Sequence, residues 1–287
     1  MMLIDGKKIA AQRREALKEL LKNNPYRKPG LAFILIGHDP ASASYVKMKA
    51  IACEEVGIHS KVIHLPKDIL QKELLRLIFE LNFDETIDGI LIQQPFPDHL
   101  DSHTLLNAVD PKKDVDGFHP LNVGKVFMQD EEGFIPCTPL GILKLIEAYK
   151  IPTEGKHVVV LGRSLIVGKP IANLLAQKSP LGNATVTICH AKTANLETHT
   201  KSADILIAAI GKPRFIKAEH LKPNAYVIDV GINRIEEEGK SKIVGDVDFE
   251  SAQKIAKMIT PVPGGVGPMT IAMLLENTYK SFMQKHK

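Results

Sequence analysis

Apolar runs short enough to be strands alternate with amphipathic, helix-like segments along the whole chain. In the first half the strand-like runs are residues 31–37, 61–66 and 89–95, and the helix-like segments are residues 6–22, 41–56, 68–82 and 100–107. In the second half the strand-like runs are residues 157–162, 185–190, 204–211 and 226–231. Strands that alternate with helices form parallel sheets whose faces the helices cover. The pattern therefore predicts an α/β protein with mostly parallel sheets.

A break in this alternation divides the chain. Residues 110–136 hold turn residues and charges but few periodic apolar positions, and a helix over residues 138–150 follows them. The last helix, over residues 270–286, follows a loop and could return to the first domain. Two α/β domains are therefore expected. The first is residues 1–120 plus 270–287, and the second is residues 121–269.

Composition and charge exclude several kinds of partner. The chain has 287 residues and a formal net charge of +4, with no block of like charges for a nucleic acid or an anionic membrane. No apolar segment reaches the roughly 20 residues of a membrane span. The three cysteines are far apart, which is typical of a reducing compartment. These features predict a cytoplasmic protein that binds no metal, nucleic acid or membrane.

A turn that contains glycines follows the strand-like run at residues 157–162. Gly162 and Gly168 bracket Arg163 and Ser164, in place of the usual G-x-G-x-x-G of a dinucleotide loop. The backbone amides of such a turn, and the start of the helix after it, could face a phosphate. An ordinary strand-to-helix turn fits the same residues, so the glycines alone do not decide.

The end of the next strand narrows the choice of cofactor. In an NAD-binding unit an acidic residue about 20 residues beyond the glycines holds the ribose 2′-hydroxyl. Here the strand ends in His190, Ala191 and Lys192, and the next acidic residue is Glu197. His190 and Lys192, together with Arg163, are cationic candidates that suit a 2′-phosphate. If the turn binds a dinucleotide, NADP is favoured over NAD.

One lysine lies on the apolar face of the helix that begins near residue 41. That face consists of Tyr45, Met48, Lys49, Ala52, Cys53 and Val56. A lysine at the edge of a buried face commonly extends its ammonium to water. Alternatively, partial burial lowers the pKa of Lys49, so that it takes part in proton transfer near neutrality.

Two polar residues of the first half could meet this lysine. Gln93 lies in LIQQPFP, at the end of the third strand, where an open α/β sheet presents side chains that contact ligands. Asp116 lies in the turn KKDVDGF. Structural roles fit as well, because Gln93 could satisfy loop backbone and Asp116 could form an Asx turn before Gly117. Spacing alone leaves both interpretations open.

Ten stretches, taken in order, resemble one enzyme family. They are DPASASYVKMK, GILIQQPFP, PKKDVDGFHP, PCTPLGI, GRSLIVGKP, TVTICHAKT, ADILIAAIGKP, VIDVGIN, GDVDF and TPVPGGVGPMT, and they span residues 35–275. On these motifs the sequence is similar to the bifunctional methylenetetrahydrofolate dehydrogenase/cyclohydrolases of one-carbon metabolism. The resemblance implies that the second domain is a Rossmann-like NAD(P)-binding domain, with an active-site cleft between the two domains.

The resemblance also implies roles for the matching residues. The implied catalytic set is Lys49, Tyr45, Gln93 and Asp116, with Lys49 as the catalytic lysine, Gln93 as its hydrogen-bonding partner and Asp116 as the anchor of the pterin ring. The expected folate contacts are Ser42, Tyr45, Asp116, Pro263, Gly264 and Gly265. The expected cofactor contacts, which include Gly168 of the turn and His190 of the strand end, are Gly162, Arg163, Ser164, Gly168, His190 and Ile232.

The reaction follows from the same resemblance. Hydride would pass from 5,10-methylenetetrahydrofolate to NADP, and water would open the methenyl product to 10-formyltetrahydrofolate. A homodimer is implied as well. Two positions depart from the family: Ala191 replaces a frequent serine, which would remove a hydrogen bond to the 2′-phosphate, and Gln94 replaces an apolar residue.

Two alternative functions also fit parts of the sequence. The first is a dehydrogenase with a single activity, of the kind that acts on shikimate-type acids, and the second is a non-catalytic nucleotide-binding regulator. The intact motifs YVKMK, KDVDGF and PVPGGVGP argue against the first. The presence of Lys49, Gln93 and Asp116 together argues against the second.

Overall fold

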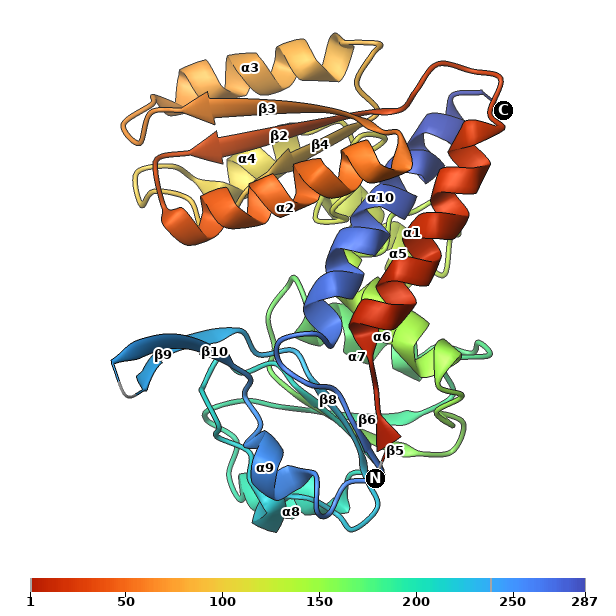
Figure 1. Ribbon diagram of the computed structural model, residues 1–287, viewed down its shortest axis with the longest axis vertical. Coiled ribbons are helices and arrows are strands. Elements are labelled where there is room, and N and C mark those ends of the chain that lie inside the picture. Colours follow the sequence, from red (N-terminus) through yellow and green to blue (C-terminus); the bar gives the residue numbers. More distant parts are fainter. Residues whose placement is uncertain (1, 238, 287) are drawn as a thin grey trace. The chain divides into compact units, whose positions relative to one another are not determined.

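The computed structural model describes residues 2–237 and 239–286 and contains two compact units (Figure 1). The three-stranded unit consists of Ala11–Cys137 and Ile271–Lys287, and the six-stranded unit of Met1–Ala10 and Thr138–Thr270. Each unit has its own main sheet, and the strands of these two sheets are parallel. The predicted α/β class with mostly parallel sheets is therefore confirmed.

The boundaries of the units differ from those expected of the domains. Strand β1 (Met2–Leu3) pairs with β11 (Met258–Ile259), so the N-terminal residues pack with the six-stranded unit. Helix α5 (Pro120–Phe127) belongs to the three-stranded unit, where Asn122 Nδ2 donates to the carbonyl of Pro111 and to Asp114 Oδ2, both at 2.8 Å. A short edge strand and a side-chain hydrogen bond leave no periodic apolar signal in the sequence.

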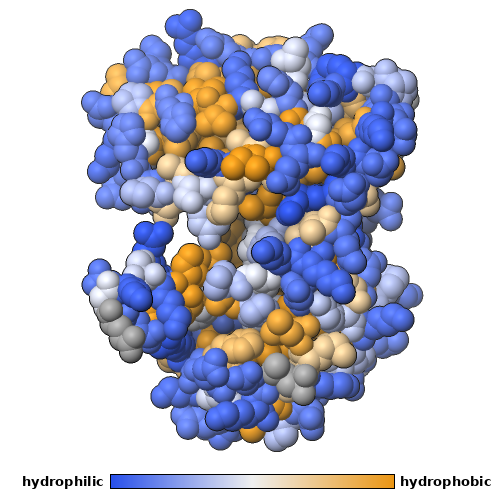
Figure 2. Space-filling view, viewed as in Figure 1, coloured by the Kyte–Doolittle hydropathy of each residue, from blue (hydrophilic) through white to orange (hydrophobic). Residues whose placement is uncertain are grey.

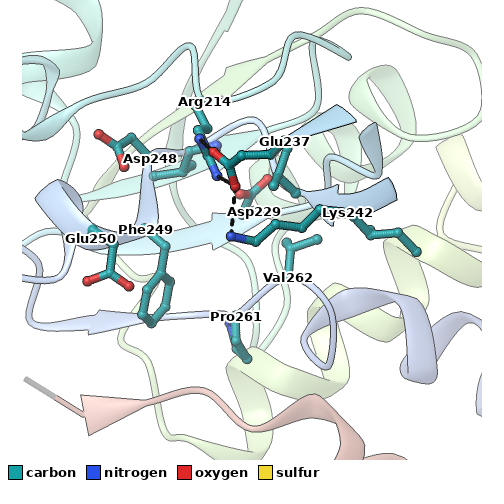
Figure 3. A pocket seen from close by; sticks show the side chains of 13 residues that line it. Arg214, Asp229, Glu237, Lys242, Asp248, Phe249, Glu250, Pro261 and Val262 are labelled. Carbon is teal, nitrogen blue, oxygen red and sulfur yellow. Dashed lines mark hydrogen bonds and ion pairs between the residues drawn. The ribbon is translucent and has the colours of Figure 1, made fainter. Parts of the chain in front are cut away.

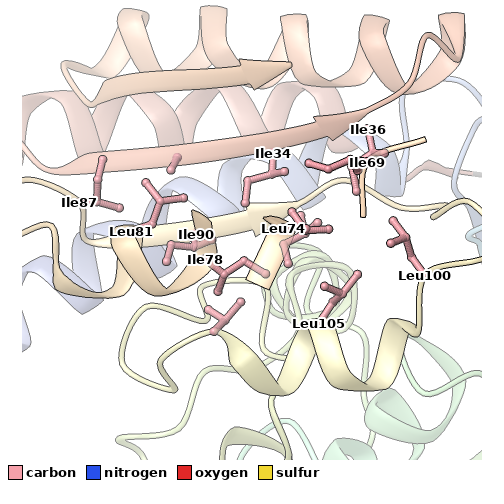
Figure 4. Packing of buried hydrophobic residues seen from close by; sticks show 13 residues of the cluster. Ile34, Ile36, Ile69, Leu74, Ile78, Leu81, Ile87, Ile90, Leu100 and Leu105 are labelled. Carbon is pink, nitrogen blue, oxygen red and sulfur yellow. The ribbon is translucent and has the colours of Figure 1, made fainter. Parts of the chain in front are cut away.

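The three-stranded sheet, in the order β3-β2-β4, is built around a fully buried central strand. Its strands are β2 (Gly30–Ile36), β3 (His59–Leu65) and β4 (Gly89–Ile92), and the helices that connect them are α2 (Pro40–Val56) and α3 (Gln71–Phe83), followed by α4 (Ser102–Ala108). Every residue of β2 is buried, as expected where helices cover both faces of a sheet. Leu74, Ile78 and Leu81 repeat at helical spacing on α3 and pack with Ile34 and Ile90 of the sheet (Figure 4).

A buried carboxylate ties the C-terminal end of the chain to this sheet. Asp88 lies just before β4, and it accepts hydrogen bonds from Arg27 Nη1 and Lys285 Nζ, both at 2.7 Å, and from the backbone N–H of Gly30 at 2.8 Å. Lys285 follows helix α10 (Val266–Gln284). Burial by itself would raise the pKa of Asp88, but the two cations outweigh burial and the pKa is lowered.

The six-stranded sheet has the order β1-β11-β8-β7-β5-β6. Its longer strands are β5 (His157–Leu161), β6 (Thr185–Cys189), β7 (Ile205–Ala208) and β8 (Tyr226–Asp229). The helical segments along this part of the chain are α6 (Cys137–Ala148), α7 (Gly168–Ala176), α8 (Leu196–Ser202), η1 (Ala218–His220) and α9 (Phe249–Ala252). The chain runs from β5 to β6 on one side and then returns to β7 on the other. At such a reversal an open α/β sheet binds ligands, outside the carboxyl ends of its strands.

Most of the predicted elements occur close to their expected positions. The helix expected over residues 6–22 is α1 (Gly6–Lys22), and the seven predicted strands are β2 to β8. The antiparallel hairpin of β9 (Asn233–Glu237) and β10 (Lys240–Val244) was not predicted, because most of its side chains are polar or exposed. Helix α5 was also missed, since several of its apolar residues face outward, with Phe127 69% exposed.

Hydrophilic residues predominate on the face drawn in Figure 2, where apolar residues form separate patches. Leu121 and Phe127 of α5 are among the exposed apolar side chains of the molecule. Within the described residues, no helix is long and apolar enough to cross a membrane.

Candidate active site and cofactor turn

Helix α2 carries Lys49 on its buried face. Asp39 caps the start of the helix, where Oδ2 accepts from the backbone N–H of Ser42 at 2.7 Å. The buried positions of the helix are Ser42, Val46, Lys49, Ala52, Cys53 and Val56. The predicted stripe is therefore wrong at Met48, which is 45% exposed, and Val46 is buried instead. Lys49 itself is only 9% exposed, so it does not extend its ammonium into bulk water.

Gln93 orients the Lys49 side chain through one hydrogen bond. Gln93 follows β4, and its Nε2 donates to the carbonyl of Gln94 at 2.6 Å. This bond turns Oε1 toward the lysine, and Lys49 Nζ donates to it at 3.0 Å. The amide therefore acts as an acceptor toward Lys49, which can donate both as an ammonium and as a neutral amine.

Asp116 and Cys137 share the surroundings of the lysine. Burial lowers the pKa of Lys49, and the nearby Asp116 carboxylate opposes this shift. Burial raises the pKa of Asp116, against the opposing effects of Lys49 and of a hydrogen bond with Cys137. The pKa of the Cys137 thiol is raised well above its usual value, first by burial and then by the Asp116 charge. Lys49 and Asp116 are thus coupled: each charge supports the other, while burial favours the neutral pair.

Asp114 holds the turn that carries Asp116. Its Oδ1 accepts from the backbone N–H of Phe118 at 3.1 Å, and its Oδ2 from the N–H of His119 and from Asn122 Nδ2, both at 2.8 Å. Burial raises the pKa of Asp114 to about 6 despite these hydrogen bonds. Asp114 therefore performs the turn-forming role that was considered for Asp116, whose carboxylate interacts with the lysine instead.

The residues predicted to contact folate fall in both units. In the three-stranded unit, the Lys49, Gln93 and Asp116 side chains interact, and Tyr45 and Ser42 lie on α2, one and two turns before Lys49. In the six-stranded unit, the loop between β11 and α10 contains Pro263, Gly264 and Gly265. Gly264 has a φ of +110°, and its carbonyl accepts from the backbone N–H of Lys7 at 2.8 Å.

The turn after β5 packs closely against the loop after β7. Gly162 has a φ of +137°, and a Cβ there would lie 2.2 Å from the carbonyl oxygen of Ala209. A Cβ on Gly168 would lie 2.2 Å from the carbonyl oxygen of Gly162. Both positions therefore require glycine. The turn and the loop leave the adjacent strands β5 and β7, between which the strand order reverses, and at such a point an open α/β sheet binds ligands.

Ser164 uses backbone amides that were expected to face a phosphate. Its Oγ accepts from the N–H of Val167 at 3.1 Å and of Gly168 at 3.2 Å, and its carbonyl accepts from the N–H of Lys169 at 3.0 Å. The start of α7 is thus satisfied within the turn, which corrects the expectation that these amides face an anion. The exposed Arg163 guanidinium and the Ser164 hydroxyl proton can still contact one.

The end of β6 presents a histidine in a defined tautomer. The backbone N–H of Lys192 donates to His190 Nδ1 at 3.1 Å. Because Nδ1 accepts this bond, the ring proton is assigned to Nε2, which can donate to a ligand. His190 is partly exposed, and Ala191 and Lys192 are exposed. These residues fit a 2′-phosphate better than a 2′-hydroxyl.

Comparison with known proteins gives one assignment for both parts of the chain. The family model described as "Tetrahydrofolate dehydrogenase/cyclohydrolase, catalytic domain" matches residues 4–116, and the model of the same family's NAD(P)-binding domain matches residues 136–286. The chain belongs to the tetrahydrofolate dehydrogenase/cyclohydrolase family. The resemblance inferred from the motifs is therefore confirmed.

Relatives from this family match the chain over nearly its whole length. The "Bifunctional protein FolD" of Prosthecochloris aestuarii is 53% identical over 293 residues, which cover 100% of this chain and 99% of the relative. The crystal structure of the Campylobacter jejuni bifunctional enzyme FolD is 51% identical, with a TM-score of 0.94 and 99% of each chain covered. The Trypanosoma brucei enzyme, complexed with NADP cofactor and inhibitor, is 35% identical, with a TM-score of 0.95, 100% of this chain covered and 99% of that one.

Sequence reasoning missed two residues of the site in this family member. Cys137 lies in the motif PCTPLGI, and nothing near it in sequence indicates that it contacts Asp116. Asp114 could have been found, because a second aspartate two residues before Asp116 in a turn is a frequent acceptor for loop amides. In the described part of the chain, no group of three or more His, Cys, Asp or Glu side chains could hold a metal ion.

Proposed function

We propose that this chain oxidises 5,10-methylenetetrahydrofolate with NADP and hydrolyses the methenyl product to 10-formyltetrahydrofolate. Its membership of the tetrahydrofolate dehydrogenase/cyclohydrolase family supports both activities. The observation that carries the proposal is the buried Lys49, whose Nζ donates to Gln93 at 3.0 Å beside Asp116. A lysine held in this way suits the hydrolytic step, in which water attacks a cationic substrate.

Lys49 manages the protons of that water. A permanently charged ammonium would repel the methenyl cation, whereas burial lowers the pKa of Lys49 and makes the neutral amine accessible. Gln93 Oε1 holds one N–H of the amine, which directs the nitrogen lone pair away from the amide. The lone pair can then accept a proton from water as it attacks. Hydride transfer needs no base at the reacting carbon, so Lys49 is not required for that step.

Asp116 anchors the pterin ring. Its carboxyl has a pKa raised by burial and can exchange hydrogen bonds with the N–H groups and ring nitrogens of a pterin. Asp114 keeps the turn in place through three hydrogen bonds, so the Asp116 side chain needs little reorganisation on binding. Ser42 and Tyr45 of α2 are the neighbouring folate contacts. Pro263, Gly264 and Gly265, and the cleft between the domains, stay predictions of the family resemblance.

The turn after β5 and the end of β6 select NADP. NADP supplies the hydride acceptor when bound. Arg163, the Ser164 hydroxyl and His190 Nε2–H are the donors for the 2′-phosphate, and no acidic residue competes there for a 2′-hydroxyl. Gly162 and Gly168 let the turn pack tightly, and Ile232 contacts the nicotinamide side. The complex of the Trypanosoma brucei relative with NADP supports this preference, and NAD is the weaker substrate.

The function is tested with purified protein, 5,10-methylenetetrahydrofolate and either NADP⁺ or NAD⁺. The absorbances of reduced cofactor and of the methenyl product are followed separately. Reduction with NADP⁺, at a higher kcat/KM than with NAD⁺, is expected. If neither cofactor is reduced, the proposed function is wrong.

The role of Lys49 is tested with Lys49→Met, and Lys47→Met is the control because Lys47 is exposed on the same helix. Lys49→Met should lose cyclohydrolase activity, and methenyl product should accumulate while hydride transfer continues. Lys47→Met should retain both activities. Equal loss of the two activities in Lys49→Met would show that the lysine positions the substrate instead.

A homodimer formed through the cofactor domains and a cytoplasmic location belong to the same proposal. Both come from the family resemblance and from the composition of the chain. Light scattering coupled to gel filtration measures the mass in solution. A mass of about 63 kDa, twice the 31.6 kDa of the chain, is expected, and a monomer would contradict the dimer.

A further inference from the structure

Two buried carboxylates lie beneath the loops at the carboxyl ends of β7 and β8. Asp229 ends β8 and is 3% exposed, and Asp246 follows β10 and is fully buried. Each packs on a glycine of the other's segment: a Cβ on Gly231 would lie 2.3 Å from Asp246 Oδ1, and one on Gly245 would lie 1.8 Å from Asp229 Oδ2. We name Asp229, Gly231, Gly245 and Asp246 the carboxylate clasp. None of these four residues was assigned a role from the sequence.

Asp246 organises the loop after β7. Its Oδ2 accepts from the backbone N–H of Ile210 at 2.7 Å and of Gly211 at 2.9 Å, and its Oδ1 from the N–H of Lys212 at 3.0 Å. One carboxylate thus satisfies three consecutive amides. Asn233 Nδ2 donates to the same Oδ1 at 2.8 Å, so the loop after β8 is tied to this carboxylate as well.

Asp229 in turn positions Asp246. Its Oδ1 accepts from the backbone N–H of Gly231 and of Asp246, both at 2.9 Å, and its Oδ2 from the N–H of Val247 at 2.9 Å. Asp229 and Gly245 of the clasp also line a pocket, together with Arg214, Glu237 and Lys242, among others (Figure 3). In that pocket Glu237 pairs with Arg214 at 2.7 Å and with Lys242 at 3.0 Å. These two cations are therefore committed to Glu237, while the clasp carboxylates bind backbone amides.

The loops held by the clasp border the proposed cofactor site. The loop after β7 begins at Ala209, against which Gly162 of the cofactor turn packs. The loop after β8 carries Ile232, which directly follows Gly231 and is 50% exposed. Both loops leave the carboxyl ends of strands next to the reversal of strand order, where an open α/β sheet receives its ligand. The clasp therefore holds the backbone of both loops through hydrogen bonds.

We propose that the carboxylate clasp positions the cofactor loops, so that its integrity sets the affinity for NADP. Asp229 and Asp246 are positioning residues here, because they act through backbone amides of the loops. This inference rests on the proposed function, which makes the crevice an NADP site. Since the cyclohydrolase chemistry uses residues of the three-stranded unit, the clasp should affect the two activities differently.

The test compares Asp246→Asn with wild type, and Asp248→Asn is the control because Asp248 lies two residues away without accepting these amides. Asparagine has one acceptor oxygen, so two of the four donors lose their acceptor. The Kd for NADPH, measured by its fluorescence, and the KM for NADP⁺ should rise about tenfold or more, a tenfold rise corresponding to about 1.4 kcal/mol. Cyclohydrolase activity on added methenyltetrahydrofolate and the KM for methylenetetrahydrofolate should stay within about twofold of wild type.

Unchanged NADPH affinity in folded Asp246→Asn would overturn the proposal. Equal loss of both activities would also overturn it, because the clasp would then be a general stability element. If Asp246→Asn does not fold, Asn233→Ala provides the test, because it removes one donor but keeps the carboxylate. A rise of a few-fold in the Kd for NADPH is then expected. No rise would refute the inference. Failure of the proposed function is seen separately, as wild type that binds NADPH without oxidising methylenetetrahydrofolate.

Discussion

Replacing Asp114 by asparagine tests how the turn that carries Asp116 is held. The variant keeps the size of the side chain but exchanges one carboxylate oxygen for an NH₂ group. Three donors, from Phe118, His119 and Asn122, converge on the two oxygens of the native carboxylate. At least one of them loses its acceptor in buried surroundings, at a cost of about 1–3 kcal/mol. We therefore expect Asp114→Asn to lower the free energy of unfolding in acid, by an amount that changes with pH.

The size of this loss should depend on pH in a defined direction. The pKa of Asp114 is raised to about 6 in the folded chain, against about 3.9 in an unfolded chain. The difference of about two pKa units corresponds to about 3 kcal/mol. Because the folded pKa is the higher one, this stability is fully present below about pH 3.9 and is lost as the pH rises through about 6. Asparagine does not titrate, so Asp114→Asn should be most destabilising in acid.

Urea unfolding between pH 4.5 and 7.5 measures this dependence. It is followed by circular dichroism because the chain has no tryptophan for fluorescence. Hydrogen exchange of the Phe118 and His119 amides assigns the change to the turn. The difference between wild type and Asp114→Asn should shrink by about 1.4 kcal/mol per pH unit up to about pH 6. The exposed Asp98, replaced by asparagine, is the control. A difference that is constant, or that grows with pH, would refute the assignment of a raised pKa.

Three further changes have expected outcomes. Asp88→Asn should lower the free energy of unfolding by about 3–5 kcal/mol near neutrality, measured by urea unfolding. Because the pKa of Asp88 is lowered, this loss should shrink as the pH falls through the lowered pKa, which is opposite to the behaviour expected at Asp114. Gly162→Ala would place a Cβ 2.2 Å from the Ala209 carbonyl oxygen and should lower the melting temperature and raise the KM for NADP⁺, and an unchanged KM would contradict the close packing. Gln93→Leu removes the acceptor of Lys49 Nζ, so the ammonium loses support, and the acid limb of the cyclohydrolase pH profile should move to lower pH; movement to higher pH would contradict this role.

The sequence was informative where one element buries one face. Strands β2 to β8 were predictable because a parallel sheet covered by helices requires continuous apolar runs, as in the fully buried β2. Lys49 could be singled out because a charged residue interrupts the apolar face of α2 at helical spacing. The acid-free end of β6 indicated the cofactor because a single side chain there decides between hydroxyl and phosphate.

The remaining features depend on contacts between distant segments. Met48 was placed on the buried face because an ideal helix tolerates a stripe shifted by part of a turn, and only the neighbouring sheet decides that Val46 is buried instead. The contact of Cys137 with Asp116 joins residues in different turns of the chain. Ser164 was expected to bind phosphate with the helix amides, but a hydroxyl three residues before those amides can accept from them directly.

In each unit a buried aspartate holds a loop by accepting hydrogen bonds from its backbone amides. The loops at the carboxyl ends of parallel strands leave backbone N–H groups without a ladder partner, and burying an unpaired N–H costs about 1–3 kcal/mol. Asp246 accepts from three consecutive amides of such a loop, after β7, and Asp114 accepts from two neighbouring amides of the turn between α4 and α5. A carboxylate can do this where an apolar side chain cannot, because its two oxygens offer several lone pairs at one point. The turn that carries Asp116 and the loop after β7 are thus held by buried acids, and substitutions at those acids should alter binding before they alter chemistry.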